Sequence, residues 1–130
     1  MAQSAEIDPP IALRLREGLA PNRARMLQLV AGMGPDAFQM TLREEAAQLE
    51  QRLLRLNDVQ TYYDIATFVR HVGVIAEIAE RFGFAALERV AGNVLDCHVA
   101  QDDVAFAATL ARLERLGHAA LFMLACQLAD

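Results

Sequence analysis

Lysine and tryptophan are absent from this 130-residue chain, and serine occurs once, at Ser4. A single serine near the start of the chain argues against a hydrolase built on a Ser-His-Asp triad. Without lysine, the phosphate-binding loop that ends in Gly-Lys-Ser/Thr is excluded as well. The 12 basic residues are therefore all arginines, and they form no basic tract. Because the net charge is −5, nucleic acid is not an expected partner.

Cysteine and long apolar runs are also scarce. Cys97 and Cys126 are the only cysteines and lack CxxC spacing, which predicts reduced thiols rather than a disulfide framework. No apolar run approaches the roughly 18–20 residues of a membrane-spanning helix. The first residues, M-A-Q-S-A-E-I-D, lack the basic region and apolar core of a signal peptide. We therefore expect a cytoplasmic protein without a membrane partner.

What the chain does contain favours helices. Hydrophobic residues make up 55% of it, Ala and Leu dominate them, and only 4 prolines and 7 glycines interrupt the sequence. Its length suits one domain with a packed core. Prolines, glycines and capping residues divide the chain into helices expected at about 8–19, 22–33, 35–56, 61–82, 85–99 and 104–128.

Apolar residues three and four positions apart predict how these helices pack. The expected inward residues of the two central helices are Leu42, Ala46, Leu49, Leu53 and Leu56, followed by Ile65, Phe68, Val69, Val72, Ile75, Ala79 and Phe82. Short corners, such as Asn57-Asp58, join antiparallel neighbours. The predicted fold is all-α, an antiparallel up-and-down four-helix bundle over residues 24–130. Additional N-terminal helices include a short one in an extension over residues 1–23.

Helical bundles often hold metal ions between facing helices. The Glu-x-x-His pairs of di-iron bundles are missing. The densest group of possible ligands is Asp96, Cys97, His98, Asp102 and Asp103. Neighbouring residues on a helix diverge by roughly 100°, so Cys97 and His98 do not readily face one ion. No metal or cofactor is therefore expected, and a metal- or cofactor-binding bundle enzyme is the least favoured alternative.

The segment Val72–Leu87, which reads V-G-V-I-A-E-I-A-E-R-F-G-F-A-A-L, resembles the centre of a histidine phosphotransfer (Hpt) domain, particularly the type found in chemotaxis histidine kinases. The family pattern is a histidine, a hydrophobe two residues later, a lysine at three, a glycine at four, and then F-G-F-x-x-L. Phe82–Leu87 supplies the last element in full. Gly34–Phe38 is similar to the usual entry into an earlier family helix, and the resemblance covers roughly residues 24–128. It implies a role in two-component phosphorelay signalling, with a response-regulator receiver domain or a histidine kinase as partner.

The sequence departs from the family pattern at the phosphoacceptor position. Counting back from Phe82-Gly83-Phe84 without a gap places Gly73 at the acceptor position, with Ala76 in place of the lysine and Glu77 in place of the glycine. A shift that makes His71 the acceptor turns Glu77 inward, which costs several kcal/mol if the carboxylate is buried. The gapless register is therefore preferred, and His71 remains the only candidate nucleophile on this helix.

The resulting hypothesis is a degenerate Hpt-like protein that binds a receiver domain without transferring phosphate. Val74 and Ile78 share a row with His71 outside the main apolar stripe, which predicts either a second packing partner or a protein-binding patch. Two alternatives stay open: an active phosphocarrier that uses His71, and a helical dimerisation or scaffold module outside phosphorelay. The expected partner-binding residues are Arg70, Gly73, Val74, Glu77, Ile78 and Arg81, around His71.

Overall fold

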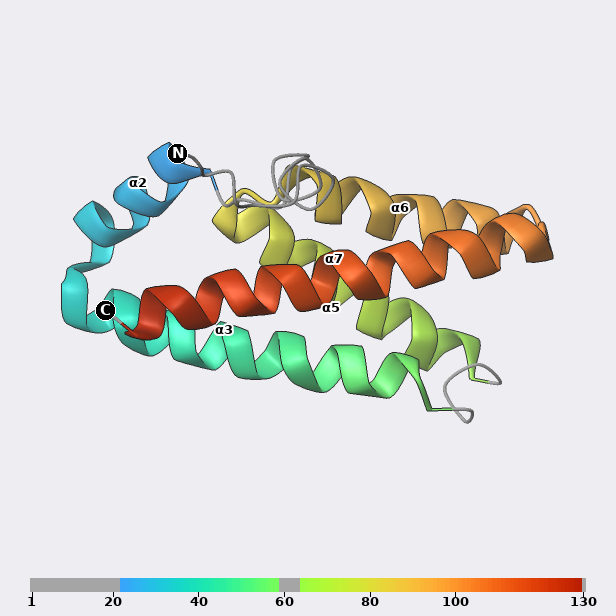
Figure 1. Ribbon diagram of the computed structural model, residues 1–130, viewed down its shortest axis with the longest axis horizontal. Helices are drawn as coiled ribbons and strands as arrows, with labels where there is room; N and C mark the ends of the chain where they lie inside the picture. The colour runs from blue at the N-terminus through green and yellow to red at the C-terminus, as the bar shows by residue number, and fades with distance from the viewer. Residues whose placement is uncertain (1–21, 59–63, 130) are drawn as a thin grey trace, which may run out of the picture.

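Helices are the only regular secondary structure among the described residues. The computed structural model describes residues 22–58 and 64–129, and within these ranges it contains five helices and no strand. The helices are α2 (Arg23–Met33), α3 (Pro35–Leu56), α5 (Ile65–Phe82), α6 (Ala85–Val99) and α7 (Asp103–Ala129) (Figure 1). The helix expected at 8–19 lies outside the described residues. Among those residues, no helix combines the length and the hydropathy needed to cross a membrane.

Four of the helices surround one hydrophobic core. α3 packs against α5 and α7, and α6 packs against the same two helices, so each of the four has two principal neighbours. Consecutive helices run in opposite directions, and α2 lies across one end, against α3 and α5 (Figure 1). The expected helices at 22–33, 35–56, 85–99 and 104–128 are confirmed to within a residue or so at each end.

The predicted core is largely confirmed. All five expected inward residues of α3 are buried, as are Phe68, Val72, Ile75, Ala79 and Phe82 of α5. Ile65 and Val69 are exceptions, because they are 45% and 41% exposed. Their expected burial is wrong because they lie at i and i+4 at the edge of the buried face of α5, where the neighbouring helices cover them only in part.

The turn between α5 and α6 depends on Gly83. This residue adopts a left-handed conformation (φ 78°), and the N–H of Phe84 donates to the carbonyl of Ala79 at 2.8 Å, which closes the end of α5. Asn22 packs directly on Gly83, so a Cβ at position 83 would overlap the Asn22 side chain. The N–H of Asn22 also donates to the Phe82 carbonyl at 3.2 Å. The glycine is therefore required both by the backbone conformation and by the close approach of α2.

α7 is the longest helix and continues through Gly117. Its first turn is capped by Asp102, whose Oδ1 accepts the N–H of Ala105 at 3.1 Å. At Gly117 the helix lies so close to Leu53 of α3 that an added Cβ would overlap the leucine side chain. Gly117 therefore allows α3 and α7 to pack closely.

Replacing Gly83 by alanine should lower the free energy of unfolding by at least about 1–2 kcal/mol, because alanine is strained in the left-handed region and its Cβ meets Asn22. Gly92→Ala is the matched control. Gly92 lies inside α6 with nothing within 4 Å of an added Cβ, so this change should stabilise the protein by about 0.5–1 kcal/mol. Urea denaturation followed by circular dichroism measures both. Equal stability of the two variants would contradict the structure of this turn.

Candidate functional site on helix α5

The start of α5 fixes which residues face outward. Asp64 is extended (φ −109°, ψ 92°) and caps the helix, so α5 begins at Ile65 rather than near Thr61 as predicted. Its carboxylate accepts the Thr67 N–H at 3.2 Å and the Thr67 hydroxyl at 2.7 Å. These hydrogen bonds, the hydroxyl's first, hold the pKa of Asp64 below its usual value. From this cap the α-helix continues without interruption to Phe82.

One row of α5 is largely exposed. Ile65, Val69, Gly73, Glu77 and Arg81 follow one another at four-residue intervals, and all but the half-buried Gly73 are exposed. An added Cβ at Gly73 would meet nothing within 4 Å, so the backbone at the centre of the row is open. We call these five residues the outer row. Gly73, Glu77 and Arg81 were expected on this face, whereas Ile65 and Val69 were expected in the core; the signal available in the sequence was their spacing of eight and four residues from Gly73.

The neighbouring row of α5 faces α3, and this corrects one predicted partner contact. Ile78 is 2% exposed and belongs to the core, while Val74 is half-buried against it. Arg81, at the end of the outer row, forms an ion pair with Glu45 of α3, and His71 bonds to α3 as well. Ile78 is therefore unavailable to a partner because α3 supplies the second packing surface. Of the other expected contacts, Arg70 is exposed beside Gly73.

His71 is a buried residue whose ring is held by α3. Its side chain is 9% exposed, and its Nδ1 lies 2.9 Å from a terminal guanidinium nitrogen of Arg52. A guanidinium only donates hydrogen bonds, so Nδ1 must be the acceptor and the ring proton of the neutral imidazole lies on Nε2. Neither nitrogen then keeps a free lone pair for attack on a phosphoryl group. In this arrangement His71 is not a competent nucleophile.

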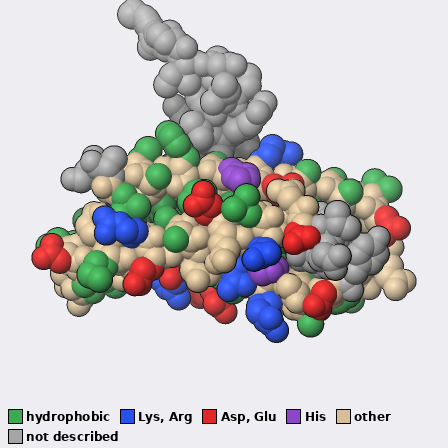
Figure 2. Space-filling model, turned by 90° about the horizontal axis from the view of Figure 1, so that it is seen from below, with side chains coloured by type: hydrophobic (Ala, Val, Ile, Leu, Met, Phe, Trp, Pro, Cys, Tyr) green, Lys and Arg blue, Asp and Glu red, His purple; other side chains and the backbone are tan. Residues whose placement is uncertain are grey.

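The charges around His71 agree with a neutral ring. Burial lowers its pKa, and the positive charges of Arg52, Arg55 and Arg70 lower it further. Figure 2 shows arginine side chains gathered beside a histidine on one face of the molecule. Protonation of His71 would remove the acceptor for Arg52 and add a fourth positive charge among the three arginines.

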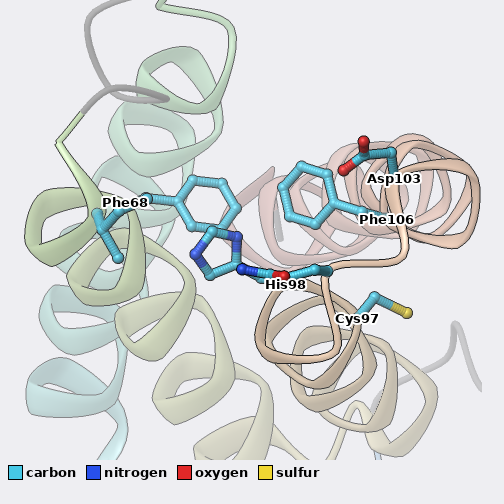
Figure 3. A pocket seen from close by; sticks show the side chains of 7 residues that line it. Phe68, Cys97, His98, Asp103 and Phe106 are labelled. Carbon is cyan, nitrogen blue, oxygen red and sulfur yellow. The ribbon is translucent and has the colours of Figure 1, made fainter.

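A second candidate region lies where α5, α6 and α7 meet. The rings of Phe68, His98 and Phe106 form a cluster with centroids 5.6–6.3 Å apart. They line an open cavity of about 520 Å³ together with Ile65, Cys97, Gln101 and Asp103. In Figure 3 the His98 ring points toward Phe68 while the Cys97 thiol points away. Within residues 22–58 and 64–129, no three His, Cys, Asp or Glu side chains are grouped to hold a metal ion.

The buried, neutral state of His71 predicts a pH dependence of stability. Because the folded-state pKa lies below the ordinary value of 6.5, the unfolded chain takes up the proton first as the pH falls. The contribution of the neutral His71 ring to the free energy of unfolding is thus fully present above pH 6.5 and is lost as the pH falls through the lowered pKa. Chemical denaturation across this range should show unfolding free energy rising with pH, and less steeply in His71→Gln. An equally steep rise in that variant would contradict the assignment.

Comparisons with known proteins do not place the chain in a family. No family model, curated protein or solved structure matches it. Its function is therefore inferred from the geometry of α5 and the helices around it.

Proposed function

We propose that this protein is an Hpt-like domain of two-component phosphorelay signalling that binds a receiver domain through the outer face of α5 and does not transfer phosphate. In this proposal α3, α5, α6 and α7 form a four-helix bundle of the Hpt type, to which α2 is an N-terminal addition. The observation that carries it is the position of Gly73. The residue at the expected phosphoacceptor position lies at the centre of the outer row, three helical turns before the Phe82-Gly83-Phe84 turn.

The face keeps the position of a phosphotransfer site but lacks its chemistry. Phosphoryl transfer from an aspartate requires a nucleophilic nitrogen and cationic groups that neutralise the phosphoryl in flight. Gly73 provides no nitrogen nucleophile, and the lone pair of His71 Nδ1 is already bonded to Arg52. Ala76 and Glu77 stand where the family has lysine and glycine, and the exposed Glu77 carboxylate would repel a phosphoryl group. A binding role without transfer fits these residues better than a phosphocarrier.

The composition of the outer row suits protein binding. Ile65 and Val69 expose apolar side chains at one end, while Glu77 and Arg81 carry opposite charges at the other. An apolar region beside charged groups is the usual make-up of a transient protein interface. Because Gly73 has no side chain, a partner can approach the helix backbone between the two ends.

A bulky residue at position 73 tests the proposal. Gly73→Tyr should weaken binding to a cognate receiver domain at least about tenfold, because the ring occupies the centre of the interface. Gly92→Tyr is the matched control, since Gly92 also lies inside a helix with open space around an added Cβ. Isothermal titration calorimetry against a panel of receiver domains measures both. Binding to no receiver, or equal weakening by the two variants, would sink the proposal.

The same receivers test the absence of transfer. Incubation with a phosphorylated receiver should leave no acid-labile phosphate on this chain. A label that appears on the wild-type protein and disappears in His71→Gln would show that the ring is released from Arg52 and acts as the acceptor. That outcome would replace the proposal with the phosphocarrier alternative.

A helical dimerisation or scaffold module is the second candidate, and exposed apolar side chains favour it. Val104, Phe122 and Leu54 are 83%, 68% and 64% exposed, on α7 and α3. Side chains of this size are usual at the centre of self-association surfaces. If the chain assembles through them, its mass in light scattering should rise with concentration and fall in the double variant Leu54→Gln/Phe122→Gln. A single monomeric mass at all concentrations would exclude this candidate.

A further inference from the structure

We infer that Arg52 binds a carboxylate of an acidic protein segment and that His71 positions the Arg52 guanidinium. Arg55 and Arg70 flank Arg52 on the surface where α3 and α5 meet. We call this the arginine site. It shares no residue with the outer row, although Arg70 lies beside that row. The inference does not require the partner to be a receiver domain.

The Arg52 guanidinium is oriented by two neutral acceptors. Its Nε donates to Gln48 Oε1 at 3.3 Å, one turn earlier on α3, and a terminal nitrogen donates to His71 Nδ1 at 2.9 Å across to α5. The side chain is half-buried, so these bonds hold it against the surface of the two helices. Neither acceptor carries a negative charge when His71 is neutral. The guanidinium is therefore fixed in place without being neutralised.

The two flanking arginines have acidic neighbours, whereas Arg52 has none within ion-pair distance in the described part of the chain. Arg55 lies 3.8 Å from the carboxylate of Asp58, and the charge of Arg70 acts on Asp64 at the start of α5. The ion pairs among residues 22–58 and 64–129 join Arg55 to Asp58 and Arg81 to Glu45. The positive charge of Arg52 thus has no ion-pair partner among the described residues, on a chain whose net charge is −5.

A single carboxylate matches the charge and the shape of this site. A guanidinium presents parallel N–H groups that bond both oxygens of a carboxylate, and such charge-assisted bonds are about twice as strong as neutral ones. A fixed guanidinium also loses little side-chain entropy when the ligand binds. An aspartate or glutamate in an acidic segment supplies the carboxylate, while Arg55 and Arg70 attract its neighbouring charges over about one Debye length.

This role explains why a histidine is useful at position 71 without being a nucleophile. A neutral imidazole offers one strong acceptor and no negative charge, so it can hold Arg52 without competing with an incoming carboxylate. An aspartate or glutamate there would neutralise the guanidinium. A phenylalanine would fill the same space but leave Arg52 without its acceptor on α5.

A hexaglutamate peptide with a fluorescent label, titrated at low salt and pH 7.5 and followed by fluorescence anisotropy, tests the site. Arg52→Gln should weaken binding about tenfold, because the central charge-assisted contact is lost. Arg89→Gln is the matched control, since it removes the same charge from an exposed position on α6 and should change binding less than about twofold. His71→Phe should weaken binding several-fold, because Arg52 must then be ordered when the peptide binds.

Arg52→Lys covers the possibility that loss of the charge disturbs the fold. It keeps the charge but not the two-point contact. Its affinity for the peptide should therefore lie between those of the wild type and Arg52→Gln, and its circular dichroism should be native. Absence of peptide binding by the wild type, or equal affinities of Arg52→Gln and Arg89→Gln, would overturn the inference. Because the peptide is not a receiver domain, failure of receiver binding leaves this result unaffected, and the two proposals fail separately.

Discussion

The packing of α5 on two flanks is the constraint from which the properties of the candidate sites follow. α3 and α6 both pack against this helix, so its buried face is wider than a single apolar stripe. On the α3 side the face includes His71 and Ile78, and the exposed surface is reduced to the outer row around Gly73. Without the contact to α3, the His71 ring would be open to solvent and Arg52 would have no acceptor on α5. Both proposals therefore depend on how these two helices meet.

The contact between α3 and α5 also decides which of two roles is open to a histidine at this surface. A phosphoacceptor must present a nitrogen lone pair to solvent, whereas a positioning residue must give that lone pair to a neighbour. The 2.9 Å contact with Arg52 assigns His71 to the second kind in this structure. An arginine at position 52 suits this arrangement, because its planar guanidinium can bond Gln48 and His71 together and keep other N–H groups for a ligand.

Most helix bounds, though not the start of α5, and the centre of the core were predictable from the sequence because they depend on local signals. The spacing of Leu42, Leu49 and Leu56 predicts a buried seam, and the structure confirms it. The edges of the α5 stripe were not predictable in the same way. Ile65 and Ile78 are equally apolar, yet one is exposed and the other is core, since only the rotation of α5 between its neighbours decides which edge is covered. A single sequence carries no record of that rotation.

The contact of Asn22 with the Phe82-Gly83-Phe84 turn has a consequence for the order of folding. The bond from the Arg25 guanidinium to the Glu80 carbonyl spans 55 residues of chain, whereas each helix of the core closes through bonds between near neighbours. Closing so long a loop costs entropy that is recovered only when the turn is already in place. The contacts of α2 with this turn therefore cannot form until α5 has ended at Gly83, whereas its contact with α3 involves the next helix in the chain.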